Sequence, residues 1–101
     1  MNKVHMPIPI ERIRDFCRKW KVKELSLFGS VLHDGFRQDS DVDVLVEFSD
    51  DALWDLWDLA AMQAELAAIF ERDVDLVEKQ GLRNPFRRRS ILNAREIVYA
   101  G

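Results

Sequence analysis

One stretch of the sequence, D-V-D-V-L-V-E-F at residues 41–48, constrains the fold of this chain more than any other. Alternation of apolar and polar residues predicts a strand with one buried face, because successive side chains of a strand point to opposite faces. The apolar face would consist of Val42, Val44, Val46 and Phe48, and the opposite face would carry Asp41, Asp43, Leu45 and Glu47. We therefore expect the core to form against a sheet that contains this strand.

Three other segments carry the apolar spacing of helices, at residues 9–21, 52–72 and 85–100. In the second of these, one apolar face is expected to pack on the sheet, and it consists of Leu53, Leu56, Trp57, Ala60, Ala64 and Ala67. A second apolar stripe consists of Leu59, Met62, Leu66 and Ile69. Either another helix of the chain or a partner must cover it, and cover within the chain is favoured because a small domain needs its core.

Two shorter apolar runs, at residues 25–28 and 74–77, predict strands beside residues 41–48. The short link between the first two strands favours an antiparallel pair, whereas a helical crossover favours a parallel pair of the second and third. The expected fold class is α/β (α+β), with a small mixed sheet of three to four strands flanked by helices. Residues 1–101 are expected to form a single domain.

Composition excludes several classes of protein. The 101 residues are 48% hydrophobic and 33% charged, which argues against a disordered chain. No apolar run approaches the roughly 20 residues that span a bilayer, and the first residues do not resemble a secretory signal. We therefore expect a cytoplasmic protein without a membrane partner. Cys17 is the only cysteine, so an intrachain disulfide is excluded and a core position is expected.

Charge is divided unevenly along the chain, whose net charge is −3. Residues 1–78 hold nine Lys or Arg against seventeen Asp or Glu, whereas residues 79–101 hold six against one. The basic tail indicates either a polyanionic ligand or acidic partner near the carboxyl end, or a solvated helix face. Direct binding of nucleic acid is not expected, because no platform of exposed aromatic residues accompanies Arg83 and Arg87 to Arg89.

Three aspartates are the candidate catalytic residues. Asp41 and Asp43 would project from one strand face, about 7 Å apart, and Asp75 would point the same way from a parallel neighbouring strand. Like charges that meet destabilise a fold unless a cation neutralises them, and Mg²⁺ is a hard ion that prefers carboxylate oxygens. Three carboxylates on adjacent strands are typical of a two-metal phosphoryl or nucleotidyl transfer site. We therefore predict that Asp41, Asp43 and Asp75 bind metal.

Gly29 and Ser30 supply a candidate phosphate-binding turn. A glycine after a strand lets backbone N–H groups approach a phosphate, and the Ser30 hydroxyl can donate to the phosphate or cap the following turn. A Gly-Ser dipeptide alone is weak evidence. Eleven residues before an Asp-x-Asp pair, it becomes a specific signal.

The run L-F-G-S-V-L-H-D-G-F-R-Q-D-S-D-V-D-V-L-V-E-F resembles the signature of the nucleotidyltransferase superfamily that includes DNA polymerase beta, in its minimal form. The strand at residues 74–77 and the tail G-L-R-N-P-F-R-R-R-S-I-L-N-A-R-E-I-V-Y-A are similar to minimal nucleotidyltransferase antitoxins of prokaryotic toxin–antitoxin pairs. The resemblance covers nearly the whole chain from about Ile10. It implies the polymerase beta-like nucleotidyltransferase palm.

The resemblance also implies a role for each site residue. Gly29 and Ser30 would hold the triphosphate of ATP, Asp41 and Asp43 would bind two magnesium ions, and Asp75 would complete the metal site and help to deprotonate the acceptor hydroxyl.

The chain departs from the family pattern after Ser30. Many members carry Ala-Arg-Gly there, whereas this chain has Leu32-His33-Asp34. An arginine contact with phosphate is therefore not implied at that point, and Arg37 is the candidate substitute.

The resemblance implies a magnesium-dependent antitoxin that transfers AMP from ATP to a hydroxyl, of a tyrosine, on a cognate HEPN ribonuclease toxin. A domain of this size has no room for a separate acceptor-binding domain, so the acceptor must come from outside. Two alternatives stay open, namely an antitoxin that neutralises by binding alone and a nucleotidyltransferase of small molecules such as aminoglycosides. The oligomeric state and the preferred base stay open as well.

Overall fold

A computed structural model describes residues 4–37 and 39–101. Its helices are α1 (Ile10–Lys19), α2 (Leu56–Phe70) and α3 (Pro85–Ala94), with 3-10 turns η1 (Gly29–Leu32) and η2 (Lys79–Gly81). Its strands are β1 (Val22–Phe28), β2 (Val42–Phe48), β3 (Val74–Glu78) and β4 (Glu96–Ala100).

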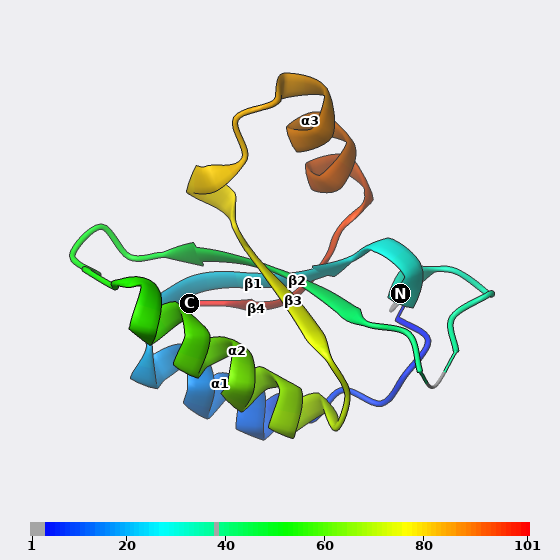
Figure 1. Cartoon of the computed structure of the whole chain (residues 1–101), viewed down its shortest axis with the longest axis horizontal. Helices are drawn as coiled ribbons and strands as arrows, with labels where there is room; N and C mark the ends of the chain where they lie inside the picture. The colour runs from blue at the N-terminus through cyan, green and yellow to red at the C-terminus, as the bar shows by residue number, and fades with distance from the viewer. Residues whose placement is uncertain (1–3, 38) are drawn as a thin grey trace.

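The four strands form one mixed sheet in the order β3-β2-β1-β4. β1 and β2 are antiparallel and β2 and β3 are parallel, as the sequence predicts. Helices α1 and α2 lie side by side on one face of this sheet, and α3 lies over the other face (Figure 1). The expected fold class, a small mixed sheet flanked by helices, is confirmed.

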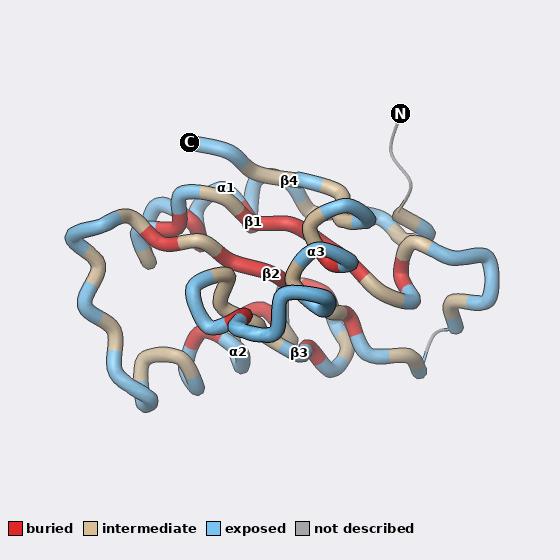
Figure 2. The backbone as a smooth tube through the Cα atoms, turned by 90° about the horizontal axis from the view of Figure 1, so that it is seen from above, coloured by how far each residue is buried: buried red, intermediate tan, exposed pale blue. Residues whose placement is uncertain are grey.

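The core lies mainly between the sheet and helices α1 and α2. Buried stretches follow the two central strands, whereas α3 is largely exposed (Figure 2). Val42, Val44 and Val46 are fully buried, which agrees with the apolar face predicted for this strand. A second, smaller cluster lies on the opposite face, where Leu82 and Ile91 pack against Phe28 and Leu45.

The predicted helix over residues 85–100 is wrong in its second half. Helix α3 ends at Ala94, Arg95 is extended, and residues 96–100 form strand β4. This strand pairs antiparallel with β1, and beyond its end Gly101 N–H donates to the Lys23 carbonyl over 2.9 Å. Pairing with an otherwise open sheet edge gives these backbone groups partners that an exposed helix end would lack.

The predicted sheet-facing side of the second long helix is also wrong. Helix α2 buries Met62, Leu66 and Phe70. Met62 and Leu66 belong to the second apolar stripe, which was expected to be covered by another helix or by a partner. Leu53, Leu56 and Trp57 are instead 90%, 82% and 84% exposed. The helix begins only at Leu56, because Asp55 and Asp58 form a reciprocal capping box there, so Leu53 lies outside the helix.

Cys17 lies in the core, as expected, and its side chain is 1% exposed. Burial raises the pKa of its thiol to about 12, so the thiolate needed for chemistry is scarce at neutral pH. Over the described parts of the chain, no helix combines the length and apolar character needed to cross a bilayer.

Candidate active site

A tight turn follows the end of β1. Gly29 has a φ of +76°, in the left-handed region, and opens the 3-10 turn η1. Val31 anchors the turn because its side chain is fully buried, while Ser30 is exposed. A side chain at Gly29 would collide with the Asp43 carboxylate, since an ideal Cβ would lie only 3.2 Å from its Cγ. The missing side chain therefore lets the turn lie directly against Asp43.

The three predicted aspartates lie along the same edge of the sheet. Asp43 pairs with Asp75 in the parallel register of β2 and β3, so both side chains lie on one face. Asp41 comes just before β2 and is exposed, as is Asp75, whereas Asp43 is half-buried. The Val42 N–H donates to the Asp73 carbonyl over 2.9 Å and joins the two strands at the level of these acids.

The charges of these aspartates act on one another. Burial raises the pKa of Asp43 above its usual range, and the nearby carboxylates of Asp75 and Asp41 raise it further. Arg87 of α3 acts in the opposite direction. The three acids therefore share one electrostatic environment, which is open to a cation.

The donor set fits magnesium by its chemistry, because carboxylate oxygens are the ligands this ion prefers. Among residues 4–37 and 39–101, none forms a hydrogen bond or ion pair with these three carboxylates. Within residues 4–37 and 39–101, no three acidic, His or Cys side chains are already gathered closely enough to hold a metal ion. Like charges lie apart until a cation draws them together. Metal binding by Asp41, Asp43 and Asp75 stays a prediction.

Two other acids on this face of the sheet do have cations beside them. Glu47 accepts from Lys79 over 3.2 Å, and Glu24 lies 3.2 Å from Arg95. These ion pairs explain the two glutamates as structural groups. The three aspartates differ from these glutamates because no ion pair within the described residues engages them.

The loop between the turn and the aspartates is tied to the end of α2. Arg72 donates to the Arg37 carbonyl over 3.0 Å and stacks on the Phe36 ring at 4.6 Å. Arg37 itself is exposed, and its backbone N–H donates to the Ser40 hydroxyl. His33 is also exposed. None of the contacts described for Arg37 or His33 involves the three aspartates, so their contact with a nucleotide stays a prediction.

Arg87 is not among the site residues predicted from the sequence, although its charge acts on Asp43. A usable signal was present, since a helix that begins at Pro85 places Arg87 four residues before the apolar Ile91, on the same helix side.

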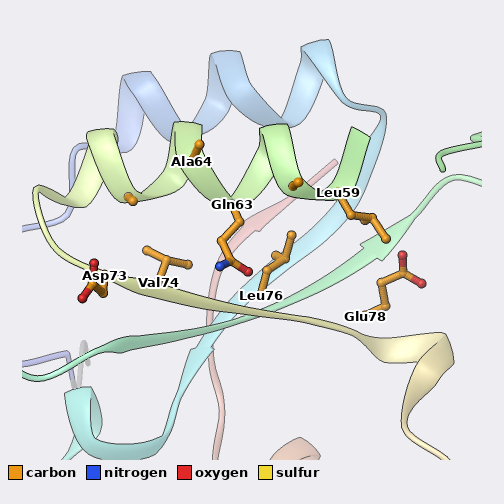
Figure 3. A pocket seen from close by; sticks show the side chains of 9 residues that line it. Leu59, Gln63, Ala64, Asp73, Val74, Leu76 and Glu78 are labelled. Atoms are coloured by element: carbon orange, nitrogen blue, oxygen red, sulfur yellow. The ribbon is translucent and has the colours of Figure 1, made fainter. Parts of the chain in front are cut away.

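A groove of about 390 Å³ lies elsewhere, between α2 and β3 (Figure 3). Gln63 reaches from the helix toward the strand, and Val74 and Leu76 form part of the floor. Because Asp75 alternates with these two residues, its side chain points to the other face of the sheet. The groove is therefore separate from the three aspartates.

Comparison with known proteins shows the family to which the chain belongs. The model of the nucleotidyltransferase domain family matches residues 10–98. Protein adenylyltransferase MntA of Thermococcus cleftensis is 30% identical over 86 residues, which cover 85% of this chain and 82% of that protein.

Two solved complexes share the fold. One is a toxin–antitoxin structure with AMP-PNP, with a TM-score of 0.75, 21% identity, and coverage of 93% of this chain and 75% of that chain. The other contains a tri-AMPylated HEPN toxin of Shewanella oneidensis with its MNT antitoxin, with a TM-score of 0.66, 21% identity, and coverage of 91% and 70%. The family match over residues 10–98 and the identity to MntA confirm the resemblance seen in the sequence, and this chain belongs to the nucleotidyltransferase domain family.

Proposed function

We propose that this protein is a magnesium-dependent protein adenylyltransferase that acts as an antitoxin. It would transfer AMP from ATP to a hydroxyl, of a tyrosine, on a cognate HEPN ribonuclease toxin and thereby neutralise the toxin. The observation that carries the proposal is the parallel pairing of Asp43 with Asp75 on one sheet face, with the Gly29 turn directly against Asp43.

The chemistry follows from this arrangement. The acceptor oxygen attacks the α-phosphorus of ATP, a new P–O bond forms, and the bond to pyrophosphate breaks. Asp75 helps to take the hydroxyl proton, while Gly29 and Ser30 hold the triphosphate. The three aspartates would hold magnesium, which when bound would lower the pKa of the acceptor hydroxyl and neutralise charge on the leaving pyrophosphate.

Three similar proteins support the choice of nucleotide and acceptor. A relative of 30% identity is named a protein adenylyltransferase, and one solved complex that shares the fold contains AMP-PNP. The other complex holds a tri-AMPylated HEPN toxin. These favour ATP as the donor and a HEPN toxin as the acceptor over a small molecule.

An exposed apolar patch supports a protein partner. The patch consists of Leu53, Leu56 and Trp57, each more than four-fifths exposed, at the start of α2. Asp50, Asp51 and Asp55 are exposed around it. A toxin surface with an apolar centre and a basic rim fits this patch, because apolar burial would supply the affinity and opposite charges the orientation.

The first experiment combines the protein with a cognate HEPN toxin, ATP and magnesium, and measures the intact mass of the toxin. We expect the mass to rise in steps of one AMP. The variant with both Asp41→Asn and Asp43→Asn should keep the fold and give no increase. If this double variant still transfers AMP, the catalytic assignment is wrong.

The same experiment tests neutralisation by binding alone, which the exposed patch also favours. Under that function the toxin mass would stay unchanged, and the double variant would still inhibit the toxin's ribonuclease activity in a stable complex. Adenylylation followed by removal of the antitoxin should instead leave the toxin inactive.

A further inference from the structure

We propose that Arg87 binds the triphosphate of the nucleotide and holds it against the Gly29–Ser30 turn. The assignment rests on the nucleotidyltransferase function proposed above and adds a basic residue to its nucleotide site. It also supplies a cation for the phosphates in a chain that has Leu32-His33-Asp34 after its Gly-Ser turn.

Packing of α3 places Arg87 over the correct face of the sheet. Ile91 is buried against Phe28 and Leu45. Phe28 is paired with Asp43 across β1 and β2, and Leu45 follows Asp43 by two residues on the same face. Arg87 lies four residues before Ile91, hence on the same side of α3. The helix therefore directs Arg87 toward the part of the sheet that carries the aspartates.

The backbone at Arg87 is fixed by two sets of hydrogen bonds. Asn84 caps α3, and its Oδ1 accepts from the N–H groups of Phe86 and Arg87 over 3.0 and 3.1 Å. Arg88 Nη1 donates to the Lys79 carbonyl over 3.0 Å and attaches the helix to η2. Arg87 thus extends from a held position, while its own side chain stays exposed.

The positive charge of Arg87 is available to a phosphate group. Lys79 and Arg95 are already paired with glutamates on this face. No ion pair within the described residues engages Arg87, although its charge acts on Asp43. A triphosphate that approaches three carboxylates needs positive charge, and a guanidinium binds phosphate oxygens in a bidentate way.

Calorimetric titration with AMP-PNP and Mg²⁺ tests the proposal on the full chain. Arg87→Gln should raise the Kd about tenfold or more, the loss expected when a hydrogen-bonded ionic contact disappears. Arg89→Gln is the matched control, because Arg89 is exposed on the same helix two residues further on, and its Kd should stay within about twofold. Arg87→Lys, which keeps the charge without the bidentate geometry, should give an intermediate Kd.

Titration with AMP separates a phosphate contact from a general effect. The Kd for AMP should hardly change in Arg87→Gln, since the β- and γ-phosphates are absent. Equal loss of AMP and AMP-PNP binding would overturn the assignment.

Two further results would overturn the assignment of Arg87 without contradicting the proposed nucleotidyltransferase function. An unchanged Kd for AMP-PNP in Arg87→Gln would remove the role of Arg87 and leave the nucleotidyltransferase function standing. A lower melting temperature that Asp43→Asn restores, with unchanged Kd, would make Arg87 a structural counter-ion. If the wild-type protein binds no AMP-PNP with Mg²⁺, the proposed function and this inference both fail.

Discussion

At position 29, both the backbone conformation and the nearby Asp43 carboxylate require a glycine. Its φ of +76° disfavours any side chain, and a Cβ would meet the Asp43 carboxylate. We predict that Gly29→Ala lowers the free energy of unfolding by at least about 1–2 kcal/mol and weakens nucleotide binding, because both conflicts must be relieved by moving the turn. Urea denaturation and AMP-PNP titration would measure the two effects. Gly35→Ala is the matched control, since among the described residues no atom beyond its chain neighbours lies within 4 Å of the added Cβ. Equal losses in both variants would contradict the explanation.

The half-buried Asp43 makes stability depend on pH in a defined direction. Burial, followed by the charges of Asp75 and Asp41, raises its pKa in the folded state. The folded protein therefore holds this proton more tightly than the unfolded chain, and the contribution of Asp43 to stability falls as pH rises through its folded-state pKa. We predict that Asp43→Asn raises the melting temperature at pH 7 without magnesium. Magnesium should then raise the melting temperature of the wild type more than that of the variant. A wild type that melts higher than Asp43→Asn in the absence of any divalent ion would contradict this account.

At the scale of elements, the sequence predicts a strand or a strand pairing correctly where its pattern allows only one structure. Alternation over residues 41–48 specified β2 and its buried valines, and the connection lengths specified both strand pairings. The positions of Gly29, Asp43 and Asp75 followed from these strands. Which side of α2 faces the sheet is a different question, because the helix carries two apolar stripes and apolar spacing alone does not choose between them.

One of the two errors has a local component and the other has a tertiary cause. The capping box of Asp55 and Asp58 delays the start of α2 to Leu56, and the helix then buries Met62 and Leu66. In the tail, Ile97 and Val98 continue the helical spacing after Ile91. Residues 96–100 form a strand because they pair with β1 in the folded protein. The run of Ile97, Val98 and Tyr99 does carry the β-branched and aromatic residues typical of strands.

The orientation of α2 makes a direct prediction. Leu66→Ala removes a fully buried side chain and should lower the free energy of unfolding by about 2–5 kcal/mol. Leu56→Ala makes the same chemical change on the same helix at a site that is 82% exposed, and its effect should stay within about 0.5 kcal/mol. Equilibrium denaturation of both variants would measure the difference. Similar losses would mean that the exposed side of α2 is covered in the isolated protein.

At the scale of the whole molecule, the two ends of β2 have different surfaces. Asp43 lies near its beginning, and the apolar patch follows its last residue, Phe48, roughly 16 Å further along at 3.3 Å per residue. A partner bound at the patch would therefore leave the proposed nucleotide site open to an acceptor segment. The acidic body and the basic α3 add charge contrast between these surfaces.

This separation predicts that binding of the partner and binding of nucleotide can be lost independently. The double variant Leu53→Ser with Trp57→Ser should weaken the complex with the toxin about tenfold or more, since two exposed apolar side chains lose their burial. Its Kd for AMP-PNP should stay unchanged. Phe86→Ser is the comparison, because Phe86 is 83% exposed on α3. A weaker complex in Phe86→Ser but not in the double variant would move the docking surface to α3.

The parallel pairing of β2 and β3 has a consequence for how this chain tolerates change. Asp43 and Asp75 belong to segments more than thirty positions apart, yet a continuous ladder of backbone hydrogen bonds places them opposite each other. Insertions in the loops after Phe48 or Gly35 would leave that alignment intact. A single residue inserted within β3 before Asp75 would turn its carboxylate to the face that α1 and α2 cover. Length variation in natural or engineered relatives should therefore collect in the loops and spare the strands.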